Sequence, residues 1–173
     1  MARSFKPRVL ATTAAAFLLG ACGGGGGGDD AAPPSSGTQT LFSVSDASIA
    51  ALNGDYGSRA IGLGAVEKRD LALCLYRFDT VAQLGNNVDL AVSGEVQFVA
   101  FSRTLLRLRL SIGNRDFVVD VVPGRPGVSD VDRDAGRVTF ADVTAEAGSG
   151  SAKQTLRLRG FLPLPRTDVP LGC

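Results

Sequence analysis

Apolar and polar residues alternate along most of the chain after Gly57, and this two-residue period constrains the fold more than any other feature. Turn residues interrupt the alternation roughly every 8 to 12 residues, as they do in antiparallel sheets. The pattern predicts an all-β domain, either a single antiparallel β-sandwich or a flattened β-barrel with about seven or eight strands. The predicted strands are residues 71–78, 88–92, 95–101, 104–112, 115–122, 137–145 and 153–162, with a further one around residues 59–63.

One short helix is predicted before these strands, over residues 46–52, because Ser45 can cap its start and Asn53-Gly54 can end it in a left-handed turn. The Gly54-Asp55-Tyr56 segment that follows is similar to the opening of lipocalin-like barrels, although it spans three residues and lacks the usual Trp. The resemblance implies a barrel that holds a small apolar ligand. A Tyr that closes one end of a sheet core explains the same segment.

The best-determined hairpin is predicted at Gly113-Asn114, a dipeptide that favours a two-residue primed turn. This turn sets the register of the flanking strands, because each step back on one strand meets one step forward on the other. One face then carries the apolar pairs Leu106–Val121, Leu108–Val119 and Leu110–Phe117. The other face brings Arg107 opposite Asp120 and places Arg109 between Asp116 and Asp120.

A second hairpin is predicted around a loop of residues 147–152. Glu146 then lies opposite Lys153, and Asp142 lies opposite Arg157. The remaining apolar pairs of this register are Val143–Leu156 and Ala141–Leu158. A loop of this length sets the register more weakly than a two-residue turn does.

The sequence Leu-Arg-Leu-Arg occurs twice and places Arg107, Arg109, Arg157 and Arg159 on sheet faces away from the apolar residues. Guanidinium groups make planar bidentate contacts, so these four could form a surface for lipid phosphate, polysaccharide carboxylate or a protein partner. The alternative is structural, because cross-strand carboxylates can neutralise the first three arginines. Arg159 lies opposite Phe140 in the predicted register and has no such partner.

Three carboxylates, Asp130, Asp132 and Asp134, are spaced two residues apart and could converge on a hard cation such as Ca²⁺. The segment resembles an EF-hand calcium loop. Gly136 comes one residue late, however, and Ala141 stands where that loop has its bidentate Glu. Neighbouring arginines can neutralise the carboxylates without a metal. A solvated loop is therefore predicted, and no metal site is favoured.

The chain of 173 residues contains no His, which excludes catalytic triads, Cys-His pairs and imidazole metal ligands. The 18 Lys and Arg residues against 17 Asp and Glu leave a net charge of +1, so no strongly basic field is present to hold a nucleic acid. A pair of carboxylates could still serve a hydrolase. Because no acidic residue lies in an apolar run that would raise its pKa, a non-enzyme without a cofactor is predicted.

Residues 1–21 have the layout of a secretory signal, with a basic start, an apolar run and two small residues. The run is shorter than the roughly 20 residues that cross a bilayer. The tetrapeptide Leu19-Gly20-Ala21-Cys22 resembles the lipobox of bacterial lipoproteins, and this resemblance implies cleavage before Cys22 and acylation of its thiol. Because Gly23 rather than Asp follows the Cys, the same resemblance implies sorting to the outer membrane.

Residues 22–40 are rich in Gly and Pro and contain no large apolar residue, which predicts a disordered tether behind the lipidated Cys22. The antiparallel β domain is expected to span residues 41–173. It contains Cys74 and Cys173, and two thiols in one small domain outside the cytosol are expected to form a disulfide. For a bridge that closes a loop of about 100 residues, the chain-entropy model gives an upper value of about 4.7 kcal/mol for the stabilisation of the folded state.

Together these features predict a lipid-anchored protein of the cell envelope, facing the periplasm or the cell surface from the outer membrane. Its expected role is non-catalytic binding or scaffolding. The expected partners are the membrane, through acyl chains on Cys22, and an envelope protein, lipid or glycan. Two alternatives stay open: a lipocalin-like barrel that carries a small apolar ligand, and a carboxylate-dependent hydrolase. A core filled by Leu106, Leu108, Leu110, Phe117 and Val119 would oppose the carrier.

Overall fold

The alternating residues form strands that pair antiparallel throughout the part of the chain that the computed structural model describes, which is residues 37–85, 90–120 and 129–173. These described residues contain eleven strands in one sheet. The strands are β1 (Gln39–Ser45), β2 (Gly54–Ser58), β3 (Gly62–Leu63), β4 (Glu67–Lys68), β5 (Leu73–Gln83), β6 (Ala91–Val99), β7 (Leu105–Ile112), β8 (Arg115–Asp120), β9 (Ser129–Asp132), β10 (Arg137–Ala147) and β11 (Gln154–Pro163).

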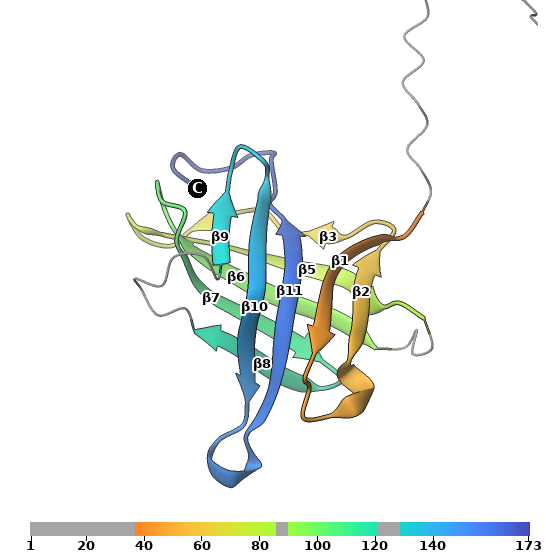
Figure 1. Ribbon diagram of the computed structural model, residues 1–173. Coiled ribbons are helices and arrows are strands. Elements are labelled where there is room, and N and C mark those ends of the chain that lie inside the picture. The colour runs from red at the N-terminus through yellow and green to blue at the C-terminus, as the bar shows by residue number, and fades with distance from the viewer. Residues whose placement is uncertain (1–36, 86–89, 121–128) are drawn as a thin grey trace, which may run out of the picture. The chain divides into compact units, whose positions relative to one another are not determined.

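Eight of these strands close into a barrel, in the order β1, β2, β5, β6, β7, β8, β10 and β11 (Figure 1). The closure is the pairing of β11 with β1, in which Gly160 lies opposite Phe42. The short strands β3 and β4 pair with β5, and β9 pairs with β10. The predicted all-β fold is thus confirmed. It takes the form of a closed up-and-down barrel, which leaves no long unpaired sheet edge.

The first and the last described residues lie at the same end of the barrel. Successive barrel strands alternate in direction, so the start of β1, the β2–β5 and β6–β7 connections and the segment after β11 share one end. We call it the terminal end, formed by residues 37–38, 59–72, 100–104, 133–136 and 164–173. The opposite end carries the β1–β2, β5–β6, β7–β8 and β10–β11 connections.

Inward-facing side chains pack the interior of the barrel into one apolar core. Tyr56 stacks on Phe42 with ring centroids 5.3 Å apart, and its hydroxyl donates to the main-chain oxygen of Leu52 at 2.8 Å. Burial raises the pKa of Tyr56 to about 12. The Gly54-Asp55-Tyr56 segment therefore supplies a core Tyr. The largest fully buried side chains are Tyr56, Tyr76, Val81, Phe98, Leu105, Leu108, Leu110, Ile112, Phe117, Leu156, Leu158 and Leu162.

The β7–β8 hairpin has the predicted two-residue turn, with φ of 55° at Gly113 and 63° at Asn114. Leu108 faces Val119 and Leu110 faces Phe117, as predicted, and all four are buried. Val121, the predicted partner of Leu106, lies outside the described residues.

The inward position predicted for Leu106 is wrong. Gln97 pairs with Arg107 but Phe98 pairs with Leu105, so Leu106 is the extra residue of a β-bulge and is half-exposed. Leu105 takes the buried place instead, because a bulge shifts the following side chains to the other face.

The predicted register of the β10–β11 hairpin is wrong by two residues. Thr144 rather than Asp142 lies opposite Arg157, and Glu146 lies opposite Thr155. The predicted pairs Val143–Leu156 and Ala141–Leu158 are replaced by Val143–Leu158 and Ala145–Leu156. A shift of two residues keeps every side chain on its face, so the apolar pattern could not detect it. The loop between β10 and β11 is residues 148–153 and includes the 3-10 helix η2 (Gly150–Ala152).

The helix predicted over residues 46–52 is also wrong, since only the three-residue 3-10 helix η1 (Ala50–Leu52) forms there. Asp46 has φ of 49°, and Ile49 rather than Ser45 precedes the helix. An isolated segment of this length gains too few hydrogen bonds to offset helix nucleation. Neither helix of the described chain is long and apolar enough to span a bilayer.

Three further strand predictions need correction. The predicted strands 88–92 and 95–101 are the single strand β6, in which Gly94 is not a turn but lies under the ring of Phe78. The strand around residues 59–63 shrinks to β3, while β1 and β2 were not predicted. The loop predicted at residues 129–136 contains β9. Gly94, Gly54 and Gly57 break the apolar alternation, which is why pattern alone misplaced these strands.

Candidate functional site

Two of the four predicted surface arginines form the ion pairs expected from the β7–β8 register. Arg107 Nε lies 2.8 Å from Asp120 Oδ1, and Arg109 Nη2 lies 2.5 Å from Asp116 Oδ2. The hydrogen bonds from Arg109 and Ser111 hold the pKa of Asp116 below its usual value. Both guanidinium groups are thus engaged by neighbouring strands of their own sheet.

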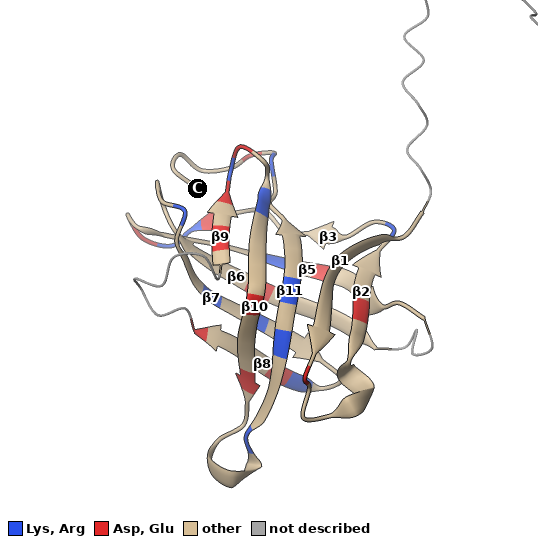
Figure 2. Ribbon diagram, in the orientation of Figure 1, with Lys and Arg blue, Asp and Glu red and all other residues tan. Residues whose placement is uncertain are grey.

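The other two arginines lie on the outer face of β11, where Figure 2 shows them as two bands of positive charge. Arg157 Nε lies 3.7 Å from Asp46 Oδ2, so its carboxylate partner comes from the β1–β2 connection and not from Asp142. Asp142 sits in the β10 bulge with φ of 56°. Arg159 lies opposite Ser43, and no described carboxylate lies within ion-pair distance of it.

A hollow of about 520 Å³ lies on the outer face of β5, β6 and β7, beside β3. Four of its five charged groups form pairs, because Arg77 Nε lies 3.3 Å from Glu95 Oε2 and Arg109 binds Asp116. The fifth is Asp79, whose Oδ1 accepts from the Thr80 hydroxyl at 2.6 Å. A glycosidase needs one carboxylic acid with a raised pKa, whereas the pKa of Asp116 is lowered.

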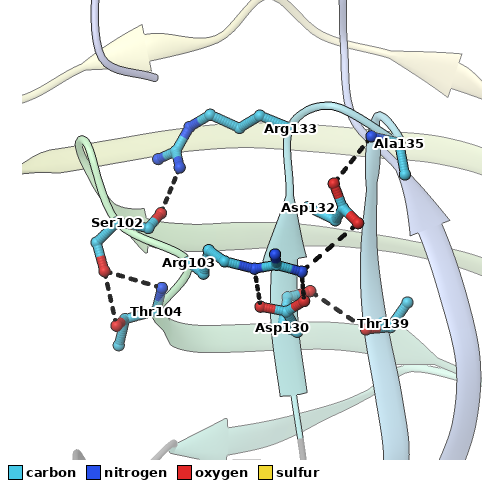
Figure 3. Close-up of polar contacts among 8 residues, drawn as sticks. All are labelled: Ser102, Arg103, Thr104, Asp130, Asp132, Arg133, Ala135 and Thr139. Atoms are coloured by element: carbon cyan, nitrogen blue, oxygen red, sulfur yellow. Dashed lines mark hydrogen bonds and ion pairs between the residues drawn. The ribbon is translucent and has the colours of Figure 1, made fainter.

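The predicted calcium ligands face an arginine (Figure 3). Arg103 donates from Nε to Asp130 Oδ1 at 2.9 Å and from Nη2 to Asp130 Oδ2, and Nη2 also lies 3.5 Å from Asp132 Oδ2. These hydrogen bonds hold the pKa of Asp130 below its usual value. Asp132 Oδ1 accepts from the Ala135 N–H at 2.9 Å, and Asp134 lines the second hollow described below. Within residues 37–85, 90–120 and 129–173, no group of three or more potential ligands is arranged to hold a metal.

A different arginine of the same segment occupies a more unusual place. Arg133 is half-buried at the terminal end, and its guanidinium donates to three main-chain oxygens. Nε donates to Cys173 O at 2.7 Å, and Nη2 donates to Val99 O at 2.9 Å. Figure 3 shows the third bond, from Nη1 to Ser102 O. The guanidinium also lies over the ring of Phe98, 5.5 Å from its centroid. None of the described Asp and Glu side chains forms an ion pair with Arg133, and its acceptor at Cys173 belongs to the last residue of the sequence.

A second hollow, of about 360 Å³, opens beside this arginine at the terminal end of the barrel. Apolar side chains from the β2–β5 connection, β6 and the segment after β11 form much of its wall, namely Val66, Phe98, Leu164, Pro165 and Val169. Its charged side chains are two arginines, Arg133 and Arg166, and one carboxylate, Asp134. Arg166 packs over Gly136, where a Cβ would lie 2.4 Å from its Nε. The hollow therefore combines apolar walls with two guanidinium groups.

The Cys74–Cys173 disulfide, present as predicted, forms part of the same end. It joins the start of β5 to the segment after β11, and both sulfur-bearing residues are buried. Cys173 also lines the hollow and accepts the bond from Arg133. Cys173 is thereby held by two contacts, the disulfide and the hydrogen bond from Arg133, and these fix the end of the segment of residues 164–173.

One buried polar atom lies deeper in the same part of the core. Tyr76 is fully buried, packs edge-on against Phe98 with centroids 6.4 Å apart, and its hydroxyl has no hydrogen-bond partner among the described residues. Burial raises the pKa of Tyr76, so the hydroxyl keeps its proton. A buried hydroxyl of this kind is normally satisfied by water or by a ligand.

Arg133 is one of the neighbouring arginines that the sequence predicts to neutralise the acidic triplet. This prediction is wrong, because Arg103 pairs with Asp130 and Asp132 instead. The partners of Arg133 lie 31 to 40 positions away along the chain and are main-chain oxygens, which carry no side-chain signal. Cys22 and the rest of residues 1–36, which include the predicted signal and most of the predicted tether, lie outside the described residues. No protein-family model, curated protein or solved structure matches this chain.

Proposed function

We propose that this protein is a lipid-anchored, non-catalytic binding protein of the bacterial outer membrane, and that it binds its ligand in the hollow at the terminal end of the barrel. The observation that carries the binding site is Arg133, a half-buried guanidinium that pairs with no described Asp or Glu side chain and lies beside apolar walls. The packed core favours binding at this mouth over binding deep inside the barrel.

The chemistry of the hollow favours a small amphipathic anion as its ligand. A guanidinium has five N–H donors, and Arg133 directs three of its bonds to main-chain oxygens, which leaves donors for a carboxylate, sulfonate or phosphate. Arg166 adds a second cation at the rim. The walls of Val66, Leu164 and Val169 suit a short apolar body, and a volume of about 360 Å³ is in the range of small-molecule sites.

Binding of the fluorescent anion 1-anilinonaphthalene-8-sulfonate tests this site. We expect one molecule to bind the folded, oxidised chain, and the Arg166→Ala variant to bind it about tenfold more weakly, because a charge-assisted contact of about 1.5 kcal/mol is lost. Fluorescence titration measures both dissociation constants. Arg109→Ala, which alters the other hollow, is the matched control and should bind as the wild type does. Equal weakening in the two variants, or none in Arg166→Ala, would contradict the proposed site.

The lipid anchor is tested separately by metabolic labelling with palmitate. We expect the full chain to incorporate label in the outer-membrane fraction and the Cys22→Ala variant to incorporate none, because the thiol is the only acceptor that the lipobox resemblance provides. Two or three acyl chains hold a protein on a bilayer almost permanently, whereas one chain does not. Equal labelling of the two proteins would refute the anchor.

A further inference from the structure

Three large apolar side chains of the described chain are strongly exposed, and all three belong to the terminal end. Leu71 is 92% exposed in the β2–β5 connection, Phe101 is 70% exposed in the β6–β7 connection, and Leu171 is 84% exposed in the segment after β11. Single exposed apolar residues are common on protein surfaces. These three belong to segments that share one barrel end, and we call them together the apolar tip.

Main-chain bonds hold the three connections of the apolar tip together. The Phe101 N–H donates to Gly172 O at 2.7 Å, and the Ala100 N–H donates to Ala72 O at 2.8 Å. Lys68 Nζ donates to Leu171 O at 2.9 Å and lies 5.2 Å from the centroid of the Phe101 ring. The nearby disulfide adds a covalent link between two of the connections. The exposed side chains are thus presented by a fixed frame.

The backbone at Phe101 supports a role for this exposure. Phe101 has φ of 59°, a left-handed conformation that is costly for a bulky aromatic residue. A conformation of this kind persists only where the surrounding structure imposes it. Here the aromatic ring is 70% exposed to solvent.

We infer that the apolar tip docks on the bilayer that carries the lipid anchor, so that the mouth of the barrel faces the membrane. This inference rests on the anchor of the proposed function. The chain enters the barrel at the terminal end, because β1 begins there at Gln39. Only 16 residues separate Cys22 from Gln39 in the sequence. A lipid on Cys22 is therefore joined to the barrel at this end and not at the opposite one.

The shape and chemistry of the apolar tip match a lipid surface. Leu71, Phe101 and Leu171 are each exposed on a separate segment of this end. Lys68 stands among them with its ammonium group at the ring of Phe101, and long basic side chains and aromatic rings are both favoured at the membrane interface. Tethering makes docking intramolecular, so a few apolar contacts suffice.

The absence of Trp from the chain provides a direct test. Phe101→Trp introduces a single indole at the apolar tip, and Ser151→Trp introduces one at the exposed β10–β11 connection of the opposite end. Each acylated full-length mature protein is reconstituted into vesicles of phosphatidylethanolamine and phosphatidylglycerol, with and without bromine on the acyl chains. We expect brominated lipid to quench the Phe101→Trp emission several-fold and to leave the Ser151→Trp emission unchanged.

These measurements distinguish a failure of membrane docking from a failure of the lipid anchor. An acylated Phe101→Trp protein whose emission is not quenched, or is quenched no more than that of Ser151→Trp, overturns the docking inference while the anchor stands. A protein that takes up no palmitate overturns the anchor, and the docking inference falls with it. Quenching that persists at high salt supports apolar insertion, because charge attraction alone would be screened. Quenching that disappears at high salt overturns it.

Discussion

Reduction of the Cys74–Cys173 disulfide is expected to lower the free energy of unfolding by about 2 to 5 kcal/mol. The bond joins residues 99 positions apart, and a long loop loses much conformational entropy when it is closed in the unfolded chain. In the folded protein the same bond holds residues 164–173 across the barrel end. The effect of reduction should therefore reach the hollow as well as the overall stability.

Thermal unfolding followed by circular dichroism measures this effect. The reduced wild type and the Cys173→Ala variant should melt at similar temperatures, roughly 10 °C below the oxidised protein. Both should also bind 1-anilinonaphthalene-8-sulfonate more weakly, because Arg133 loses its fixed partner at Cys173 O. A thiol titration of the native oxidised protein should detect neither Cys. Two reactive thiols, or equal melting temperatures, would contradict the expectation.

Replacing Gly160 with Ala is expected to destabilise the protein by about 3 kcal/mol or more. Gly160 has φ of 139°, a conformation that L-residues rarely adopt, and it lies in the pairing of β11 with β1 that closes the barrel. A Cβ there would lie 2.4 Å from Leu41 O and 2.5 Å from Phe42 Cα. Because these are main-chain atoms, the two strands would have to separate.

Urea unfolding curves of Gly160→Ala and wild type test this expectation through their midpoints. Gly37→Ala is the control, because Gly37 lies just before β1, has no atom within 4 Å of an added Cβ, and should shift the free energy by less than about 0.5 kcal/mol. A Gly160→Ala protein with the midpoint of the wild type would show that the β1–β11 pairing tolerates a wider spacing.

The hollow and the apolar tip belong to the same end of the barrel, and together they suggest one route for a ligand. Cys173 lines the hollow, while Gly172 accepts the hydrogen bond from Phe101 beside it. If the tip lies on the bilayer, an amphipathic anion can pass from the lipid surface into the hollow without crossing water. The binding and docking experiments above test the two halves of this arrangement independently.

Local features of the sequence determined the strands and one register. The alternating pattern identified β7, β8, β10 and β11 within a few residues, and the Gly113-Asn114 turn set the β7–β8 pairing, because a two-residue turn leaves one register only. The disulfide followed from the count of cysteines in the domain. Each of these inferences uses residues that are close in sequence, or a residue type with one available partner.

Only the tertiary structure decided how the strands close and where the site lies. Three features depend on packing between distant segments, and an apolar pattern of period two cannot predict them. They are the β1–β11 pairing, the bulge that places Leu106 outward and the two-residue shift of β10 against β11. The same holds for Arg133, whose oxygen partners are main-chain atoms of other connections, and for the apolar tip, whose three residues meet only because alternating strands return to one end of a closed barrel.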